Sequence, residues 1–144
     1  MKRFLAVLLV LAAACGGKDS TGPSMPAVAG VWQYSDNTSS AALGISCSST
    51  GPVSVSQNGG NFTGSSTVHQ ICTDSFGNSS TADAVVPVTG GQINGSQISF
   101  QTDGCQYAGS LSGNPTNAMS GSETCTVAVS GTNYTFTGPW QASR

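Results

Sequence analysis

The chain has 144 residues, of which 38% are hydrophobic and only 7% are charged, and its formal net charge is -2. This much apolar content with so little net charge is unlike a disordered protein, and the length fits one domain. Only four residues are Lys or Arg. They form no basic patch for phosphates, which argues against nucleic-acid binding.

Residues 1–14 have the pattern of an export signal. Lys2 and Arg3 form a short positive region, and residues 4–11 form an apolar run that is followed by three alanines. The run is too short to span a bilayer and has the flanks of a signal peptide. We therefore expect export from the cytoplasm.

Cys15 follows the three alanines, and this small-small-Cys ending resembles the lipobox of bacterial lipoproteins. That family is cleaved just before the cysteine, which then carries several acyl chains and holds the protein on a membrane. Ala12 stands where the family prefers Leu. The alternative is ordinary cleavage after Ala14, which leaves Cys15 as a free thiol. Because Cys15 is also the odd one of five cysteines, lipidation is the favoured interpretation.

Residues 15–28 are expected to form a lipidated tether. The segment 16–26 is rich in Gly, Ser and Pro, which is typical of a flexible, partly extended linker. Lys18 occupies the position at which Asp retains lipoproteins in the inner membrane of enteric bacteria. The resemblance therefore implies a cell-envelope location, in the outer membrane rather than the inner one.

Residues 29–144 are predicted to form an all-β domain. No stretch after residue 29 has helical periodicity, and short apolar-polar alternations are separated by Gly, Asn, Asp and Pro, as in an antiparallel meander. The predicted strands are 29–35, 43–57, 61–72, 83–90, 96–102, 105–112, 118–129 and 133–142.

Turn chemistry predicts how these strands pair. Gly and Asn tolerate positive φ, so residues 58–61 should close a hairpin; Asp103–Gly104, a loop around Pro115 and residues 130–133 give three more turns. The hairpins place the domain cysteines opposite one another. Exported proteins form disulfides, whereas metal binding or free thiols are the alternative. The predicted disulfides are Cys47–Cys72 and Cys105–Cys125.

Period two then predicts one interior face. Trp32 and Tyr34 share a face in the first strand, and Gly90–Gly91 is a candidate bulge. The stretch around Val85–Val86 is apolar on both faces, so alternation does not assign it an interior face. The other residues predicted to face inward are Phe62, Val68, Ile98, Phe100, Tyr107, Leu111, Met119, Val127, Val129, Tyr134, Phe136 and Trp140.

The expected architecture is an eight-stranded antiparallel up-and-down meander barrel. Glycines recur two residues after an apolar residue in several strands, as in strands that bend strongly enough to close on themselves. Closure would also remove the exposed edges of a sheet that has few charges. The alternative is a β-sandwich in which the same strands split into two sheets.

The segment Gly30-Val31-Trp32 resembles the G-x-W of lipocalins and of the avidin group, which have calycin-type barrels. In lipocalins a late Arg packs across this Trp, so the resemblance implies that Arg144 packs on Trp32. The other lipocalin motifs are absent. Only Trp32 and Trp140 are present, so the tryptophan set of the avidin biotin site is absent and biotin binding is not implied.

Glu123 is the most informative single residue. The predicted pairing places it inside, opposite Tyr107 and Trp140, and a buried carboxylate is costly unless it is partnered. It should bond Tyr107, pair with Arg144 or face a wet cavity; the alternatives are a solvated barrel mouth or a structural salt bridge. A small polar or cationic ligand would suit such a cavity. We expect a ligand to enter at the mouth of the barrel, near the candidate ligand-binding residues Trp32, Tyr107, Glu123, Trp140 and Arg144.

Other chemistry has weaker support. His69 is the single histidine, is predicted to face outward, and cannot form a metal site with oxidised cysteines. No G-x-S-x-G elbow and no catalytic residue is identified, and no cofactor is required. We therefore expect a non-catalytic, membrane-anchored extracytoplasmic lipoprotein that binds a small ligand. The alternatives are a structural or protein-interaction envelope module with a filled core and a secreted hydrolase.

Overall fold

The computed structural model describes residues 24–144. The predicted signal at residues 1–14, Cys15 and the first part of the tether lie outside the described residues. Within residues 24–144, no helix has the length and hydropathy needed to cross a membrane. The described chain consists of eight strands joined by turns. They are β1 (Gly30–Ser40), β2 (Ile45–Asn58), β3 (Asn61–Asp74), β4 (Ser79–Asn94), β5 (Gln97–Thr102), β6 (Cys105–Ser112), β7 (Ala118–Val129) and β8 (Thr132–Ser143).

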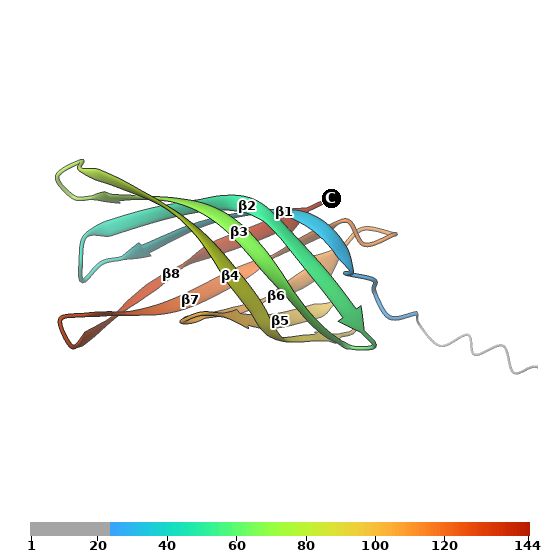
Figure 1. Ribbon diagram of the computed structural model, residues 1–144. Helices are drawn as coiled ribbons and strands as arrows, with labels where there is room; N and C mark the ends of the chain where they lie inside the picture. The colour runs from blue at the N-terminus through green and yellow to red at the C-terminus, as the bar shows by residue number, and fades with distance from the viewer. Residues whose placement is uncertain (1–23) are drawn as a thin grey trace, which may run out of the picture.

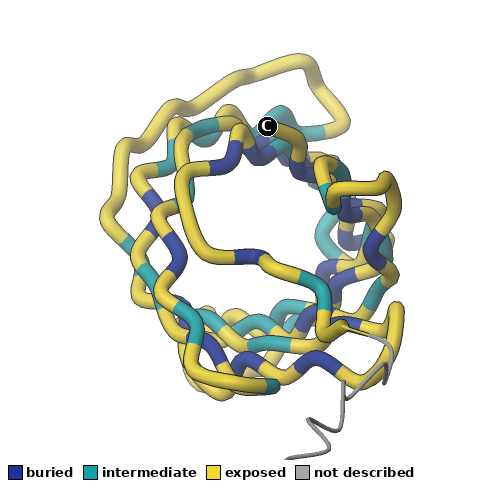
Figure 2. Tube along the Cα trace, turned by 90° about the vertical axis from the view of Figure 1, so that its right-hand side faces the viewer, coloured by how far each residue is buried: buried dark blue, intermediate teal, exposed yellow. Residues whose placement is uncertain are grey.

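The strands form a closed antiparallel barrel in chain order, with β8 paired to β1 (Figure 1). The prediction of an up-and-down meander barrel is confirmed, and the strands do not split into a sandwich. Buried residues line the inside of the tube, and exposed residues alternate with them along each strand (Figure 2). Closure provides hydrogen-bond partners for strands that contain few charges.

Three of the four hairpin registers are those that turn chemistry predicts. Cys47 lies opposite Cys72 and Cys105 lies opposite Cys125, and both pairs are disulfides. The register predicted for the last hairpin is wrong by two residues. Ser130 and Gly131 both have positive φ and make a two-residue turn, which is tighter than the expected four-residue turn.

The two-residue shift changes the neighbours of Glu123. In β8 the residue opposite Glu123 is Gly138, and Trp140 lies opposite Gly121. Tyr107 of β6 lies opposite Glu123, as predicted. Because the shift is an even number of residues, every side chain of β8 keeps its predicted face.

Two strands exceed their predicted lengths by four residues or more. β1 continues to Ser40 instead of ending at 35, because its polar residues pair with β2 and β8 rather than forming a loop. β4 begins at Ser79 instead of 83 and continues to Asn94 instead of ending at 90. It runs through the predicted bulge, since the register with β3 and with β5 shifts next to Gly90.

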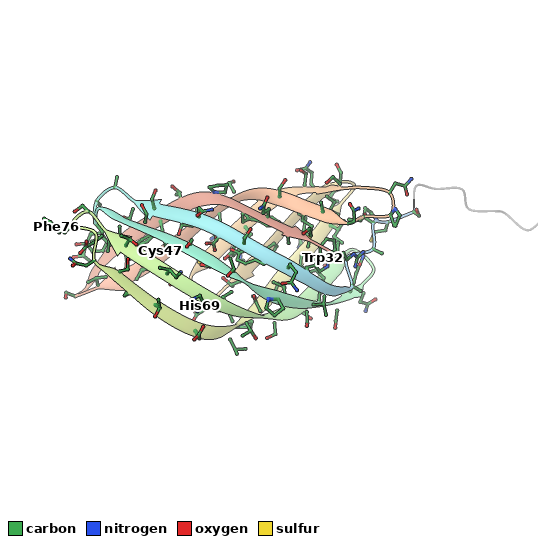
Figure 3. All side chains as sticks on the ribbon, turned by 90° about the horizontal axis from the view of Figure 1, so that it is seen from above. Trp32, Cys47, His69 and Phe76 are labelled. Atoms are coloured by element: carbon green, nitrogen blue, oxygen red, sulfur yellow. A yellow bond between two sulfur atoms is a disulfide. The ribbon has the colours of Figure 1, made fainter. Side chains whose placement is uncertain are left out.

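The two ends of the barrel differ. At the end that we call closed, the segment 24–29 crosses the barrel before β1 begins (Figure 2). At the end that we call open, the hairpins β1–β2, β3–β4 and β7–β8 extend beyond the short β5–β6 hairpin (Figure 1). Figure 3 places Trp32 near the closed end and Phe76 at the tip of the β3–β4 hairpin, at the open end.

The short β5–β6 hairpin explains where the predicted interior is wrong. Val127 and Val129 of β7 lie beyond Cys125, the last residue of β7 that pairs with β6, and each is 44% exposed. Their side chains point to the same face as Glu123, but here β7 has no neighbouring strand on the β6 side to cover them. Tyr134, in β8 opposite Val127, is correspondingly only half-buried. Parity therefore predicts the face of a residue correctly but not its burial.

The closed end is held by side-chain hydrogen bonds to the backbone. Nε1 of Trp32 donates to the carbonyl of Val28 over 2.8 Å, and the amide of Val28 donates to Oε1 of Gln57 over 2.6 Å. Trp32 and Val28 are both fully buried. These bonds hold the segment 24–29 across the end of the barrel, where Val28 forms part of the floor of the interior.

Candidate ligand-binding cavity

The barrel contains a cavity of about 240 Å³. It reaches from Val28 at the closed end to Thr38 and Ala82, which lie nearer the open end. Most of its wall is apolar, which favours the non-polar part of a small ligand. Its apolar lining includes Val55, Val88, Ile98, Phe100, Met119 and Trp140.

Aromatic rings form one wall of this cavity. Phe100 stacks on Tyr107 with ring centroids 4.4 Å apart, and Phe100 and Trp140 form a T-shaped pair with centroids 5.3 Å apart. Nε1 of Trp140 donates to the carbonyl of Ser122 over 3.1 Å. Each ring of the wall is therefore in contact with another ring or bonded to the backbone.

Two acidic side chains line the same cavity, Asp36 from β1 and Glu123 from β7. They are only 7% and 2% exposed. The hydroxyl of Tyr34 donates to Oδ2 of Asp36 over 2.6 Å, and the amide of Ser49 donates to Oδ1 over 2.8 Å. Both carboxyl oxygens of Asp36 thus have donors, which is the arrangement of a stabilised carboxylate.

Glu123 is not satisfied in the same way. Its Oε2 lies 3.4 Å from the hydroxyl oxygen of Tyr34 and 3.8 Å from Sγ of Cys125, which is in a disulfide and has no proton to donate. Its buried Oε1 has no hydrogen-bond partner among residues 24–144. Since Tyr34 gives its one hydroxyl proton to Asp36, Tyr107 is the remaining phenolic donor near Glu123, which is too few donors for an ionised carboxylate.

The electrostatics of the cluster follow from burial. The pKa of Glu123 is raised to about 7, chiefly by burial and then by the nearby charge of Asp36, while hydrogen bonds from the hydroxyls of Tyr107 and Tyr34 partly oppose the rise. Burial also raises the pKa values of Tyr34 and Tyr107 above their ordinary value. Near neutral pH the cluster therefore holds Glu123 with a proton that it can lose.

The five predicted ligand-binding residues do not form one cluster. Tyr107, Glu123 and Trp140 line the cavity. Trp32 and Arg144 lie at the closed end and do not line it. The predicted residues therefore fall into two groups: three line the cavity, and two lie at the closed end of the barrel.

Arg144 does not approach Glu123. Its guanidinium lies 4.2 Å from the centre of the Trp32 ring, as the lipocalin resemblance implies, and donates to the carbonyls of Ala27, Ala29 and Thr116. The possible ion pair between Glu123 and Arg144 is not formed.

Sequence reasoning missed Asp36 and the hydroxyl of Tyr34 as parts of the site. Trp32, Tyr34 and Asp36 are spaced by two and face inward together, so the same alternation that predicts Glu123 inside also predicts Asp36 inside. Asp36 was missed because the first strand was predicted to end at residue 35, one residue before it.

The potential metal ligands offer little. Among residues 24–144, one group of three potential ligands lies close together, Cys105, Cys125 and Glu123. The two cysteines form a disulfide, so neither supplies a thiolate. His69 faces outward as predicted, and its Nδ1 lies 2.7 Å from Oδ1 of exposed Asp83 (Figure 3).

Comparison of the chain with family models, with curated proteins and with solved structures found no match.

Proposed function

We propose that this protein is a lipid-anchored, extracytoplasmic binding protein that holds a small molecule inside its barrel. The observation that carries this proposal is the buried Oε1 of Glu123, which has no donor among the described residues although its side chain lines a cavity. A buried acceptor left unpaired costs about 1–3 kcal/mol. A ligand that donates a hydrogen bond would remove this cost.

The cavity supports this function over the alternatives. A structural module with a filled core needs no space of about 240 Å³ next to its buried acid. That volume lies just below the usual range of ligand pockets, roughly 300–1,000 Å³, which favours a molecule smaller than a typical drug. The hydrolase alternative has no comparable support, because within residues 24–144 no serine or threonine hydroxyl is hydrogen-bonded to either acid.

A pair of valine variants tests whether binding occurs in the cavity. Val88 is 3% exposed and lines the cavity, whereas Val85, on the same strand, is 72% exposed on the outside. Val88→Phe should fill the cavity, and Val85→Phe should not. Calorimetry with benzyl and 2-naphthylmethyl compounds, each as the alcohol and as the amine, measures the effect.

We expect at least one of these compounds to bind the unmodified chain and the Val85→Phe variant with equal affinity, and to bind Val88→Phe at least tenfold more weakly. If none binds the unmodified chain, or if Val88→Phe binds as well as Val85→Phe, the proposed function is rejected. Circular dichroism spectra that match the unmodified chain would show that both variants are folded.

The membrane anchor is proposed from the sequence and needs its own test. Expressed in a Gram-negative host with labelled palmitate, the chain should incorporate the label and sediment with the outer membrane. Cys15→Ser should lose both properties. Labelling that survives this substitution would contradict the assignment of Cys15 as the acylated residue.

A further inference from the structure

We propose that the ligand of the cavity is a small amine that binds as a cation, with its ammonium group between Glu123 and Asp36. This inference rests on the proposed function and names the chemical class of the ligand. It stands on three properties of the interior, which are the charge of its lining, the number of available protons and the number of potential metal ligands.

The lining of the cavity is acidic without compensation. Asp36, Asp103 and Glu123 line it, and none of its lining residues is Lys, Arg or His. Within residues 24–144 the basic side chains are Arg144, which is committed to the closed end, and His69, which faces outward. An anionic ligand would therefore meet only like charges, whereas a cation would meet opposite ones.

The available protons favour a donor with several N–H groups. The cluster contains two carboxyl groups but only two phenolic hydroxyls, of Tyr34 and Tyr107, and Tyr34 already donates to Asp36. An ammonium group has three donors and no acceptor, as the side chain of Lys has. It could serve Oε1 of Glu123 and a second acceptor at once, which a single hydroxyl could not do.

A metal ion fits the same site poorly. Divalent ions in proteins take four or more ligands, and the one compact group of potential ligands in the described chain has its two cysteines in a disulfide. An organic cation needs fewer donors, because its apolar part can pack on the ring wall formed by Phe100, Tyr107 and Trp140.

Binding of such a cation must displace a proton. The groups that face Glu123 are Tyr34 and Asp36 of β1, Tyr107 of β6 and the disulfide that joins β6 to β7, and none of them is a cation. Below pH 7 the free site holds Glu123 mainly as the neutral acid. When R–NH₃⁺ binds, the carboxylate becomes the favoured form and the proton passes to the buffer.

The test compares compounds that differ in one group, using the purified full chain. Benzylamine and 2-naphthylmethylamine are compared with benzyl alcohol and 2-naphthylmethanol, and with benzoate and 2-naphthoate. Calorimetry at pH 6 and pH 8.5, in buffers of different ionisation enthalpy, gives both the affinity and the number of protons released.

At pH 8.5 we expect each amine to bind at least roughly tenfold more tightly than its alcohol, the gain of a charge-assisted hydrogen bond, and the carboxylates not to bind. At pH 6 amine binding should release close to one proton, and alcohol binding should release none. Glu123→Gln should abolish both the preference and the release, whereas Asp83→Asn, which removes an exposed acid, should change neither.

The outcomes separate this inference from the proposed function. Alcohols that bind as tightly as the amines would overturn the amine assignment and leave the cavity as the binding site. Proton release that persists in Glu123→Gln would also overturn it. If no compound of the series binds at either pH, the proposed function itself fails. Calcium chloride and zinc chloride are tested in the same way. If either ion binds with micromolar affinity and Glu123→Gln removes that binding, the ligand is a metal ion and not an amine.

Discussion

The guanidinium carbon of Arg144 lies 4.2 Å from the centre of the Trp32 ring, and its nitrogens donate hydrogen bonds to three backbone carbonyls. Two of these carbonyls belong to the segment 24–29 and the third to Thr116 in the β6–β7 loop. One side chain therefore joins the two ends of the described chain and a loop across the closed end of the barrel. The arrangement explains why Trp32 is fully buried although it lies near the end of the barrel.

Arg144→Ala should lower the free energy of unfolding by about 1–2 kcal/mol, from loss of the ring contact and of the carbonyl bonds. Urea unfolding measures the loss, with an unchanged slope against denaturant. Arg144→Lys keeps the charge but cannot reach three carbonyls with a planar fork, so it should recover less than half of the loss. Full recovery by Lys would show that charge, rather than the hydrogen-bonding geometry, stabilises the closed end.

The pairing of the strands could be predicted because turn residues restrict the backbone. Gly59–Gly60 and Asp103–Gly104 are residues with known turn preferences, and each gave the correct register. Ser130 gave no such signal, because a non-glycine residue with positive φ is uncommon. The register error at this turn therefore reflects a serine in a backbone conformation that its residue type does not predict.

Each disulfide should contribute roughly 3 kcal/mol to stability, because the two loops that they close span similar separations of 25 and 20 residues. The double variants Cys47→Ser with Cys72→Ser, and Cys105→Ser with Cys125→Ser, should lose similar amounts in urea unfolding. Peptide mapping without reduction should recover the same two pairs from the unmodified chain. A mapped link between Cys47 and Cys105 would contradict the barrel register.

The site was harder to predict than the fold, because parity fixes the face of a residue but not its depth along the barrel axis. Glu123 and Tyr107 were correctly placed inside from alternation alone. Trp32 and Arg144 were expected at the same barrel mouth as these residues, but they lie at the closed end. To place them correctly, one must know which end of the barrel is closed. That property depends on the path of the segment 24–29, which has no periodicity to read.

Gly109 lies in β6 directly beneath the ring of Trp140. A Cβ atom at Gly109 would come within 2.8 Å of Cζ2 of Trp140 and would collide with the carbonyl oxygen of Ser120. Gly109→Ala should therefore cost about 1–3 kcal/mol and alter the near-ultraviolet circular dichroism of Trp140. Ser110→Ala changes the adjacent outward-facing residue and should do neither. A Gly109→Ala variant as stable as the unmodified chain would show that the barrel wall is not closely packed here.

The pH dependence of stability should carry the signature of Glu123. Its pKa is about 7 in the folded chain and near 4.5 when unfolded, so between these values the folded state binds one more proton. The contribution of this group is therefore complete below pH 4.5 and is lost as the pH rises through 7. The contribution of Glu123 to the free energy of unfolding is at most roughly 3 kcal/mol, because each unit of pKa difference corresponds to about 1.36 kcal/mol. The lowered pKa of exposed Asp74 acts in the opposite direction and at lower pH, outside this window.

Glu123→Gln removes the titrating proton while it keeps the shape of the side chain. Between pH 5 and pH 8 the free energy of unfolding of the unmodified chain, measured with urea, should fall. The free energy of unfolding of the variant should fall by no more than half as much. At pH 8 Glu123→Gln should be the more stable of the two, because it no longer buries an ionised carboxylate whose Oε1 lacks a donor among the described residues. Asp83→Asn serves as the control, since Asp83 is exposed and should leave the slope unchanged. If Glu123→Gln and the unmodified chain have parallel pH profiles, Glu123 is ionised throughout this range and the proton released on amine binding must come from another group.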